Sequence, residues 1–267
     1  MIGIEQRISI ELSVDTIDAA LAADTLDIQR IELCSAGTLG GLTPGPGLLE
    51  TAVARCQRVA VHVLIRPRAG DFRYTAAEAD VLIADTAAAV RAGAAGVVVG
   101  ALTGRDEVDK AVLTELVVAA QGREVTFHRA IDVSRDPLTA VEQLIESGVD
   151  RVLSSGHAPR AEQGAPVLAE MVRVAEGRLA VMACGGIRAH NAQAVLAATG
   201  VTHLHAAPRK PARPGPTADE TPDPVGSTSP RAAPSAVDFD GKAEFDLAEA
   251  RALIAAIRNP PLSQILA

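Results

Sequence analysis

Eight short apolar runs of β-strand composition alternate along this chain with segments of helical composition. The runs cover residues 7–13, 29–34, 59–66, 95–101, 124–130, 150–155, 178–184 and 201–207. Their starts lie about 22 to 36 residues apart, which suits a strand, a crossover helix and the turns between them. Eight such units predict an α/β fold, a single (β/α)8 TIM-barrel domain over residues 1–267. An open doubly wound sheet is the alternative, but it favours a Gly-x-Gly-x-x-Gly turn that the first strand lacks.

Capping signals support helices between these runs. Residues 75–78 read Thr-Ala-Ala-Glu, a capping box, and Asp136 precedes a proline suited to the first helical turn. Four glycines stand where helices are expected to end: Gly93, Gly148, Gly177 and Gly200.

One segment breaks the alternation. Residues 206–235 hold eight of the sixteen prolines and almost no large apolar residue. Such a stretch cannot build a core, so residues 212–235 are predicted to be a flexible Pro-rich insertion. An amphipathic pattern over residues 244–258 then predicts the last helix of the barrel.

Composition excludes several classes of function. With a formal net charge of −8 and one Tyr, four Phe and no Trp, the chain lacks the basic surface and the stacking platforms of nucleic-acid binders. Its three cysteines are scattered, which argues against a disulfide framework. It has neither a signal-peptide pattern at the start nor an apolar run long enough for a membrane span. These features predict a cytoplasmic protein with no nucleic-acid or membrane partner.

Polar groups collect near the carboxyl ends of the predicted strands, where TIM barrels bind their ligands. They are Glu11, Ser13, Glu32, Cys34, His62, Arg66, Thr103, His128, Arg129, Ser154, Ser155, Cys184, His203 and His205. Glu11 and Glu32 occupy matching places on the first two strands, so their charges should raise the pKa of one carboxyl. That suits general acid–base chemistry, with His128 as a third candidate. Alternatively, each glutamate forms an ion pair with Arg66 or Arg129.

Arginines and glycines near the same edge suggest anion binding. Arg66 should lie near the opening, where a guanidinium suits a carboxylate or phosphate; alternatively it orders its own loop through Asp71. His128 is expected to face the barrel interior, so that its neighbour Arg129 reaches over the rim or pairs with Asp132.

Two glycines follow the seventh strand. Gly185 and Gly186 offer the free N–H groups of a barrel phosphate site, unless they serve only the turn.

A metal site is the competing hypothesis. Cys34 shares a strand face with Glu32, and together with His62, His128 or His205 it offers sulfur and nitrogen ligands for copper or zinc. No Cys-x-x-Cys or His-x-x-Glu-His spacing supports such a site. Cys56 falls in a predicted helix and is expected to pack in the core.

Four motifs, in order, carry a family resemblance. They are Glu-Leu-Cys-Ser-Ala at 32–36 with Gly-Gly-Leu-Thr-Pro at 40–44, Val-His-Val-Leu-Ile-Arg-Pro-Arg at 61–68 with Gly-Asp-Phe at 70–72, Phe-His-Arg-Ala at 127–130 with Asp132, and Gly-Val-Asp-Arg-Val-Leu-Ser-Ser-Gly at 148–156. With them the chain resembles the CutC family of copper homeostasis proteins. The resemblance implies a (β/α)8 barrel, a cytosolic homo-oligomer and copper as the ligand. The family-like residues are Glu11, Glu32, Cys34, His62, Arg66, Asp71, His128, Arg129 and Asp132.

Two functions therefore stand as expectations. The resemblance predicts a copper-binding homeostasis protein. The residue types predict an enzyme that acts on a small carboxylate or phosphate by Glu and His acid–base chemistry with arginine anchoring, because a copper carrier needs thiolates more than arginines.

Overall fold

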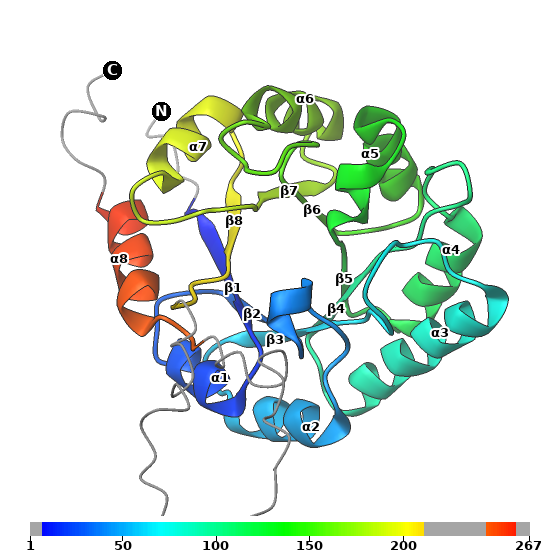
Figure 1. The fold of residues 1–267 in the computed structure, drawn as a ribbon, viewed down its shortest axis with the longest axis horizontal. Coiled ribbons are helices and arrows are strands. Elements are labelled where there is room, and N and C mark those ends of the chain that lie inside the picture. Colours follow the sequence, from blue (N-terminus) through cyan, green and yellow to red (C-terminus); the bar gives the residue numbers. More distant parts are fainter. Residues whose placement is uncertain (1–6, 211–243, 260–267) are drawn as a thin grey trace, which may run out of the picture.

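Eight parallel strands close into a barrel in sequence order in the computed structural model, which describes residues 7–210 and 244–259 (Figure 1). The strands are β1 (Ser9–Val14), β2 (Arg30–Leu33), β3 (Ala60–Leu64), β4 (Gly96–Val99), β5 (Glu124–Phe127), β6 (Arg151–Ser154), β7 (Ala180–Ala183) and β8 (His203–Ala206). β8 pairs with β1, which closes the ring and confirms the predicted TIM barrel over the open sheet. The insertion predicted at 212–235 lies outside the described residues.

Helices surround the barrel (Figure 1). They are α1 (Ile17–Asp24), α2 (Pro46–Arg55), α3 (Ala76–Arg91), α4 (Lys110–Ala119), α5 (Pro137–Glu146), α6 (Ala165–Ala175), α7 (Ala192–Thr199) and α8 (Leu247–Arg258), with short 3-10 turns η1 (Gly37–Leu39) and η2 (Arg129–Val133). The capping box at Thr75 and Glu78 is present, and the Asp136 side chain caps α5. The last helix begins at Leu247 rather than at 244, because the Asp246 side chain accepts from the Glu249 N–H and fixes the first turn there.

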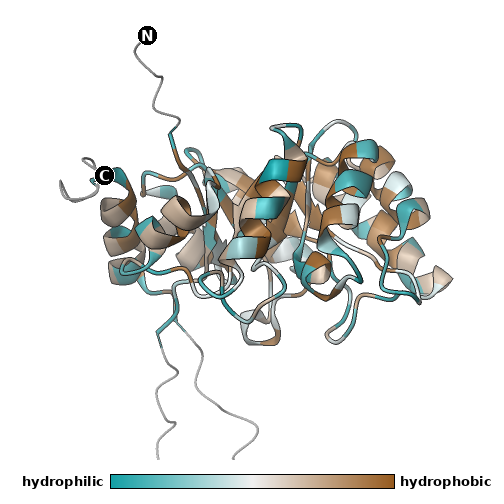
Figure 2. Cartoon of the chain, turned by 90° about the horizontal axis from the view of Figure 1, so that it is seen from above, coloured by the Kyte–Doolittle hydropathy of each residue, from teal (hydrophilic) through white to brown (hydrophobic). Residues whose placement is uncertain are grey.

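The main hydrophobic core lies between the barrel and the helices. Alternate strand residues point outward and are fully buried there, as Ile10, Leu12 and Val14 are on β1. The helices cover these residues with their apolar faces and turn polar residues to the outside (Figure 2). Within the described residues, no helix is both long and apolar enough to cross a membrane.

The inside of the barrel is unusually polar. Its amino-terminal half holds the ion pairs of Arg30 with Glu11 and of Arg151 with Glu124, both at 3.1 Å, and His62 lies 3.4 Å from Glu124. Branched apolar residues usually fill this space in TIM barrels. These ion pairs inside the barrel therefore lie directly beneath the site at the carboxyl ends of the strands.

Candidate functional site

A cavity of about 270 Å³ opens where the strands end. Loops after β2, β3, β5, β7 and β8 contribute to its wall. The ionisable side chains that line it are Glu32, Arg66, His128, Arg129, Cys184, Arg188, His205 and Arg209. Four of the residues that the sequence singled out therefore line one cavity: Glu32, Arg66, His128 and Arg129.

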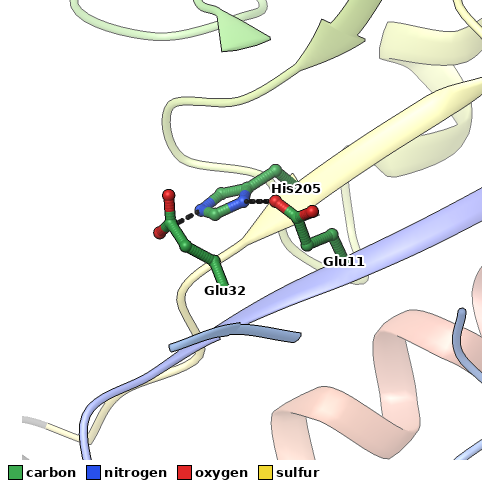
Figure 3. A group of neighbouring side chains, drawn as sticks. All are labelled: Glu11, Glu32 and His205. Atoms are coloured by element: carbon green, nitrogen blue, oxygen red, sulfur yellow. Dashed lines mark hydrogen bonds and ion pairs between the residues drawn. The ribbon is translucent and has the colours of Figure 1, made fainter. Parts of the chain in front are cut away.

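His205 joins the two glutamates of the predicted acid–base pair (Figure 3). Its Nδ1 lies 2.8 Å from Oε1 of Glu11, and its Nε2 lies 3.8 Å from Oε2 of Glu32. Strand register explains the meeting, because Glu11 pairs with His205 across β1 and β8, and Glu32 pairs with Ser13 across β1 and β2. All three side chains are buried.

Arg30 contacts this group from the amino-terminal half of the barrel. Its Nε donates to Oε2 of Glu11 at 3.1 Å, so Glu11 is held between a guanidinium and an imidazole. The alternative that the glutamates pair with Arg66 or Arg129 is therefore wrong for Glu11. Arg30 sits on the strand next to β1 and faces Glu11 directly in the register, whereas Arg66 and Arg129 lie beyond the strand ends.

The environments of the two carboxyls push their pKa values apart. Burial alone would raise the pKa of Glu11, but the hydrogen bond from His205 and the charges of His205 and Arg30 hold it well below its usual value. Burial raises the pKa of Glu32, and the charge of Glu11 adds to the rise. Burial lowers the pKa of His205, yet the two glutamates overcome it and raise that pKa overall. Glu11 thus stays ionised and orients His205, while Glu32 and His205 hold the exchangeable protons.

His128 faces the barrel interior, as predicted, and is only 4 % exposed. Its Nδ1 accepts from the Ala130 N–H at 3.1 Å, and its Nε2 has no partner among the described residues. Burial and the nearby Arg66 lower the pKa of His128 to about 3, so the ring is neutral at physiological pH. These contacts do not favour His128 as an acid or a base.

Arg66 is buried in the cavity wall and serves the loops around it. It donates to the backbone carbonyls of Leu39, Gly41 and Gly70 at 2.9–3.1 Å. Its loop contacts therefore do not run through Asp71, which is exposed and pairs with Arg68 instead. Asp71 does not line the cavity.

Arg129 lies at the rim and pairs with Asp132 at 2.7 Å, as predicted. It also donates to Oγ of Ser155 at 2.7 Å. Asp132 in turn accepts from Ser154 and from the Ser155 backbone, so this carboxylate ties the loops after β5 and β6 together.

The loop after β7 brings backbone N–H groups to the cavity. Gly185 and Gly186 line it with φ of +89° and +80°, a region that favours glycine, and neither amide donates to a described residue. Arg188 follows them, and among the described residues its guanidinium donates only to the adjacent Ile187 carbonyl. This loop combines a positive side chain with free amide donors, which is the chemistry an anion needs.

The predicted metal ligands do not come together. Cys34 packs against Leu64 and Val98, and His62 lies deeper in the barrel beside Glu124. Among the described residues the single cluster with metal-ligand spacing is Glu11, Glu32 and His205, which includes neither Cys34 nor His62 nor His128.

The thiols themselves do not suit copper. Burial raises the pKa of Cys34 to about 12 and, for Cys184, well above the usual thiol value. Cu(I) selects thiolates, and a cavity wall rich in arginines repels a cation. The donor set therefore does not fit a copper ion. The third cysteine, Cys56, is buried as predicted.

Sequence reasoning placed His205 near the mouth but not in the acid–base set, and it missed Arg30 and Arg188. His205 lies two residues after His203, on the same face of β8, and it is the register partner of Glu11 on β1. That register is the signal that could have joined them. Arg30 looked like the edge of an apolar strand, and its role depends on the unusual polar lumen.

The fold and the cavity define a TIM-barrel protein with a buried carboxylate–imidazole group under an arginine-lined mouth. The CutC family model matches residues 8–210. The chain belongs to the CutC family.

Relatives of the same name support the assignment. A CutC family protein of Glaesserella parasuis is 43% identical over 196 residues, which are 73% of this chain and 80% of the relative. One from Xanthomonas campestris is 43% identical over 202 residues, or 76% and 84% of the two chains. The crystal structure of CutC from Streptococcus agalactiae, whose name relates it to copper homeostasis, matches with a TM-score of 0.70 and 30% identity over 74% of this chain and 97% of that one.

A more distant structure confirms the fold alone. Phosphoribosyl anthranilate isomerase from Thermococcus kodakaraensis matches with a TM-score of 0.55 at 15% identity, over 94% of this chain and 99% of that one.

Proposed function

We propose that this protein is an enzyme that binds a small carboxylate or phosphate compound in the barrel mouth and exchanges a proton with it through Glu32 and His205. The observation that carries this proposal is the Glu11–His205–Glu32 group, with contacts of 2.8 and 3.8 Å, beside a cavity whose wall bears four arginines. Proton transfer needs a group whose pKa is shifted toward the working pH, and the raised pKa of Glu32 meets that need.

The charge of the wall supports an anionic ligand. Arg129 is neutralised by Asp132, and Arg209 lies 3.4 Å from Asp15. Neither Arg66 nor Arg188 pairs with a carboxylate among the described residues. Two guanidinium charges are thus left for a ligand in a chain whose formal net charge is −8.

Each residue has a separate task in this mechanism. Glu11, ionised and fixed by Arg30, accepts from Nδ1 of His205 and keeps the opposite ring nitrogen directed toward Glu32. Glu32 takes or gives the proton of the substrate, and His205 returns or removes it. The arginines and the amides of the β7 loop hold the anionic group while the proton moves.

Copper binding is the second candidate, and its support is the family resemblance together with the name of the Streptococcus agalactiae relative. Cys34 would be its thiol ligand. Against it stand the raised pKa of that thiol and its absence from the one ligand-like cluster of the described residues. We therefore rank anion chemistry first.

One pair of titrations separates the candidates. Inorganic phosphate and, in reducing buffer, Cu(I) are each titrated into the wild-type protein and into the Arg188→Gln and Cys34→Ser variants. Loss of the Arg188 guanidinium should weaken phosphate binding by about 1.5–3 kcal/mol, the scale of a hydrogen bond to a charged group, while Cys34→Ser leaves it unchanged. Arg188 is a cleaner site than Arg66, whose removal would also free three backbone carbonyls.

Arg173→Gln, on the outer helix α6, is the matched control for the lost charge. Tight Cu(I) binding that Cys34→Ser weakens by about tenfold or more, with no phosphate binding, would favour the copper candidate instead.

We also propose a cytoplasmic location and self-association, as the family resemblance implies. Light scattering after size exclusion measures the mass directly, and a mass of 27.5 kDa, that of one chain, would contradict self-association.

A further inference from the structure

Three buried nitrogens in the cavity wall have no hydrogen-bond partner among the described residues. Nη2 of Arg209 lies 3.4 Å from a carboxylate oxygen of Asp15, whereas Nε of Arg66 and Nε2 of His128, in residues that are 7 % and 4 % exposed, have no described carboxylate beside them. A buried N–H left unpaired costs about 1–3 kcal/mol, so proteins rarely keep one without a use. Both residues line the same cavity as Glu32 and His205.

The ring of His128 is fixed in one protonation state by its surroundings. Its Nδ1 accepts from the Ala130 N–H, because His128 is the N-cap of η2. A neutral imidazole carries a single proton, so that proton sits on Nε2. Burial holds the pKa at about 3, and the ring therefore stays a neutral donor.

Packing fixes the place of both donors. A Cβ on Gly100 would lie 2.4 Å from Cε1 of His128, so the ring rests directly on this glycine of the β4 end. The Phe72 ring contacts both residues: it lies tilted against His128, with 4.8 Å between the ring centroids, and its centroid is 5.2 Å from the Arg66 guanidinium carbon. Three backbone carbonyls hold the other nitrogens of Arg66.

We propose that His128 and Arg66 form a donor pair that holds one substrate oxygen as negative charge develops on it. The inference rests on the proposed function and names its substrate class, small anionic carbonyl compounds. Glu32 takes a proton from the carbon beside the carbonyl, the C–H electron pair forms the C=C bond, and the carbonyl π pair moves to the oxygen. The donor pair stabilises that oxyanion, and His205 returns a proton to the other carbon or oxygen.

A neutral donor suits this task. An imidazolium would give its proton away to the oxyanion, whereas a neutral N–H donates without being consumed. The donors come from the ends of β3 and β5, and the proton-exchanging groups come from β2 and β8. The reacting carbonyl would therefore lie between the two sets.

The test uses oxalate, a planar dianion with the two adjacent oxygens of an enediolate, and inorganic phosphate, which is tetrahedral. His128→Asn keeps an N-cap acceptor for the Ala130 N–H but loses the Nε2 donor. Oxalate should bind about tenfold to a hundredfold more weakly to this variant, and phosphate should change less than about threefold. His62→Asn removes another buried imidazole, stacked on Gly96 outside the cavity, and is the matched control.

A second measurement needs no variant. Nitrogen-15 spectra of histidine-labelled and arginine-labelled wild-type protein should show His128 protonated at Nε2 alone, and oxalate should shift the Nε–H signals of both His128 and Arg66. A proton on Nδ1, or signals that bound oxalate leaves in place, would overturn the donor pair.

The outcomes separate the two proposals. If both anions bind and His128→Asn weakens them equally or not at all, the donor pair is wrong and the anion site stands. If the wild-type protein binds neither anion, the proposed function fails, and this inference fails with it.

Discussion

Replacing Gly100 by alanine should displace the ring of His128 and nothing else. The added Cβ would lie 2.4 Å from Cε1 and 2.5 Å from Nδ1, whereas ordinary contacts begin at 3.4 Å, so the ring has to retreat by about 1 Å. The ring is also in contact with Phe72, and the 3.1 Å hydrogen bond from Ala130 stretches as the ring moves. Gly100 does not have a positive φ, so the alanine adds no backbone strain.

The magnitude follows from these contacts. Overpacking of this kind costs about 1–3 kcal/mol, and the weakened hydrogen bond lies within the same range. We expect a loss of about 2 kcal/mol of unfolding free energy, or about 4–8 °C in melting temperature for a domain of this size. Oxalate binding should fall by about tenfold or more, because an error of about 1 Å in a reacting group is costly.

Urea denaturation and oxalate titration measure both effects. Gly104→Ala is the control, because nothing lies within 4 Å of its Cβ and its φ is not positive. If Gly100→Ala matches Gly104→Ala in stability and in oxalate affinity, His128 does not rest on Gly100 and the geometry of the donor pair is wrong.

Three further outcomes follow from the buried charges. Arg30→Met should lose about 3–5 kcal/mol of unfolding free energy, because it leaves the Glu11 carboxylate buried without its guanidinium partner. The double variant Arg30→Met with Glu11→Gln should recover most of that loss. Urea denaturation measures both, and equal losses in the single and the double variant would refute the pairing. His62 and His128, with pKa values lowered to about 4 and about 3, stay neutral when folded but take up protons when unfolded below pH 6.5, so stability should fall as the pH drops from 6.5 toward 4, by up to about 1.4 kcal/mol per pH unit for each ring. His205 has the opposite sign: its raised pKa gives stability that is present below pH 6.5 and lost as the pH rises through the folded value, and denaturation of His205→Gln between pH 6 and pH 9 should lack that loss.

The fold was predictable because its signal is local and repeated. Apolar runs, capping residues such as Thr75 and Asp136, and the regular spacing each predict the same architecture. Strand parity also placed Glu32, Arg66 and His128 at the mouth.

The roles of these residues were less predictable, because they depend on contacts between strands far apart in the sequence. Glu11 and His205 are 194 residues apart, and only closure of β8 on β1 brings them to 2.8 Å. The neutral state of His128 depends on the Ala130 N–H and on burial, which no spacing reveals. Cys34 was predicted as a ligand because it shares a strand face with Glu32, but its side chain packs against Leu64 and Val98 and is not part of the ligand-like cluster.

The central claim is that the barrel mouth is an anion-binding, proton-exchanging site rather than a thiolate copper site. A crystal structure of the protein equilibrated with both phosphate and Cu(I), with diffraction recorded on both sides of the copper absorption edge, tests it most directly. The account predicts an anion bound to the Arg188 guanidinium and to the amides of Gly185 and Gly186, with no copper signal at Cys34. A copper peak within bonding distance of the Cys34 thiolate, above a mouth that holds no anion, would contradict it.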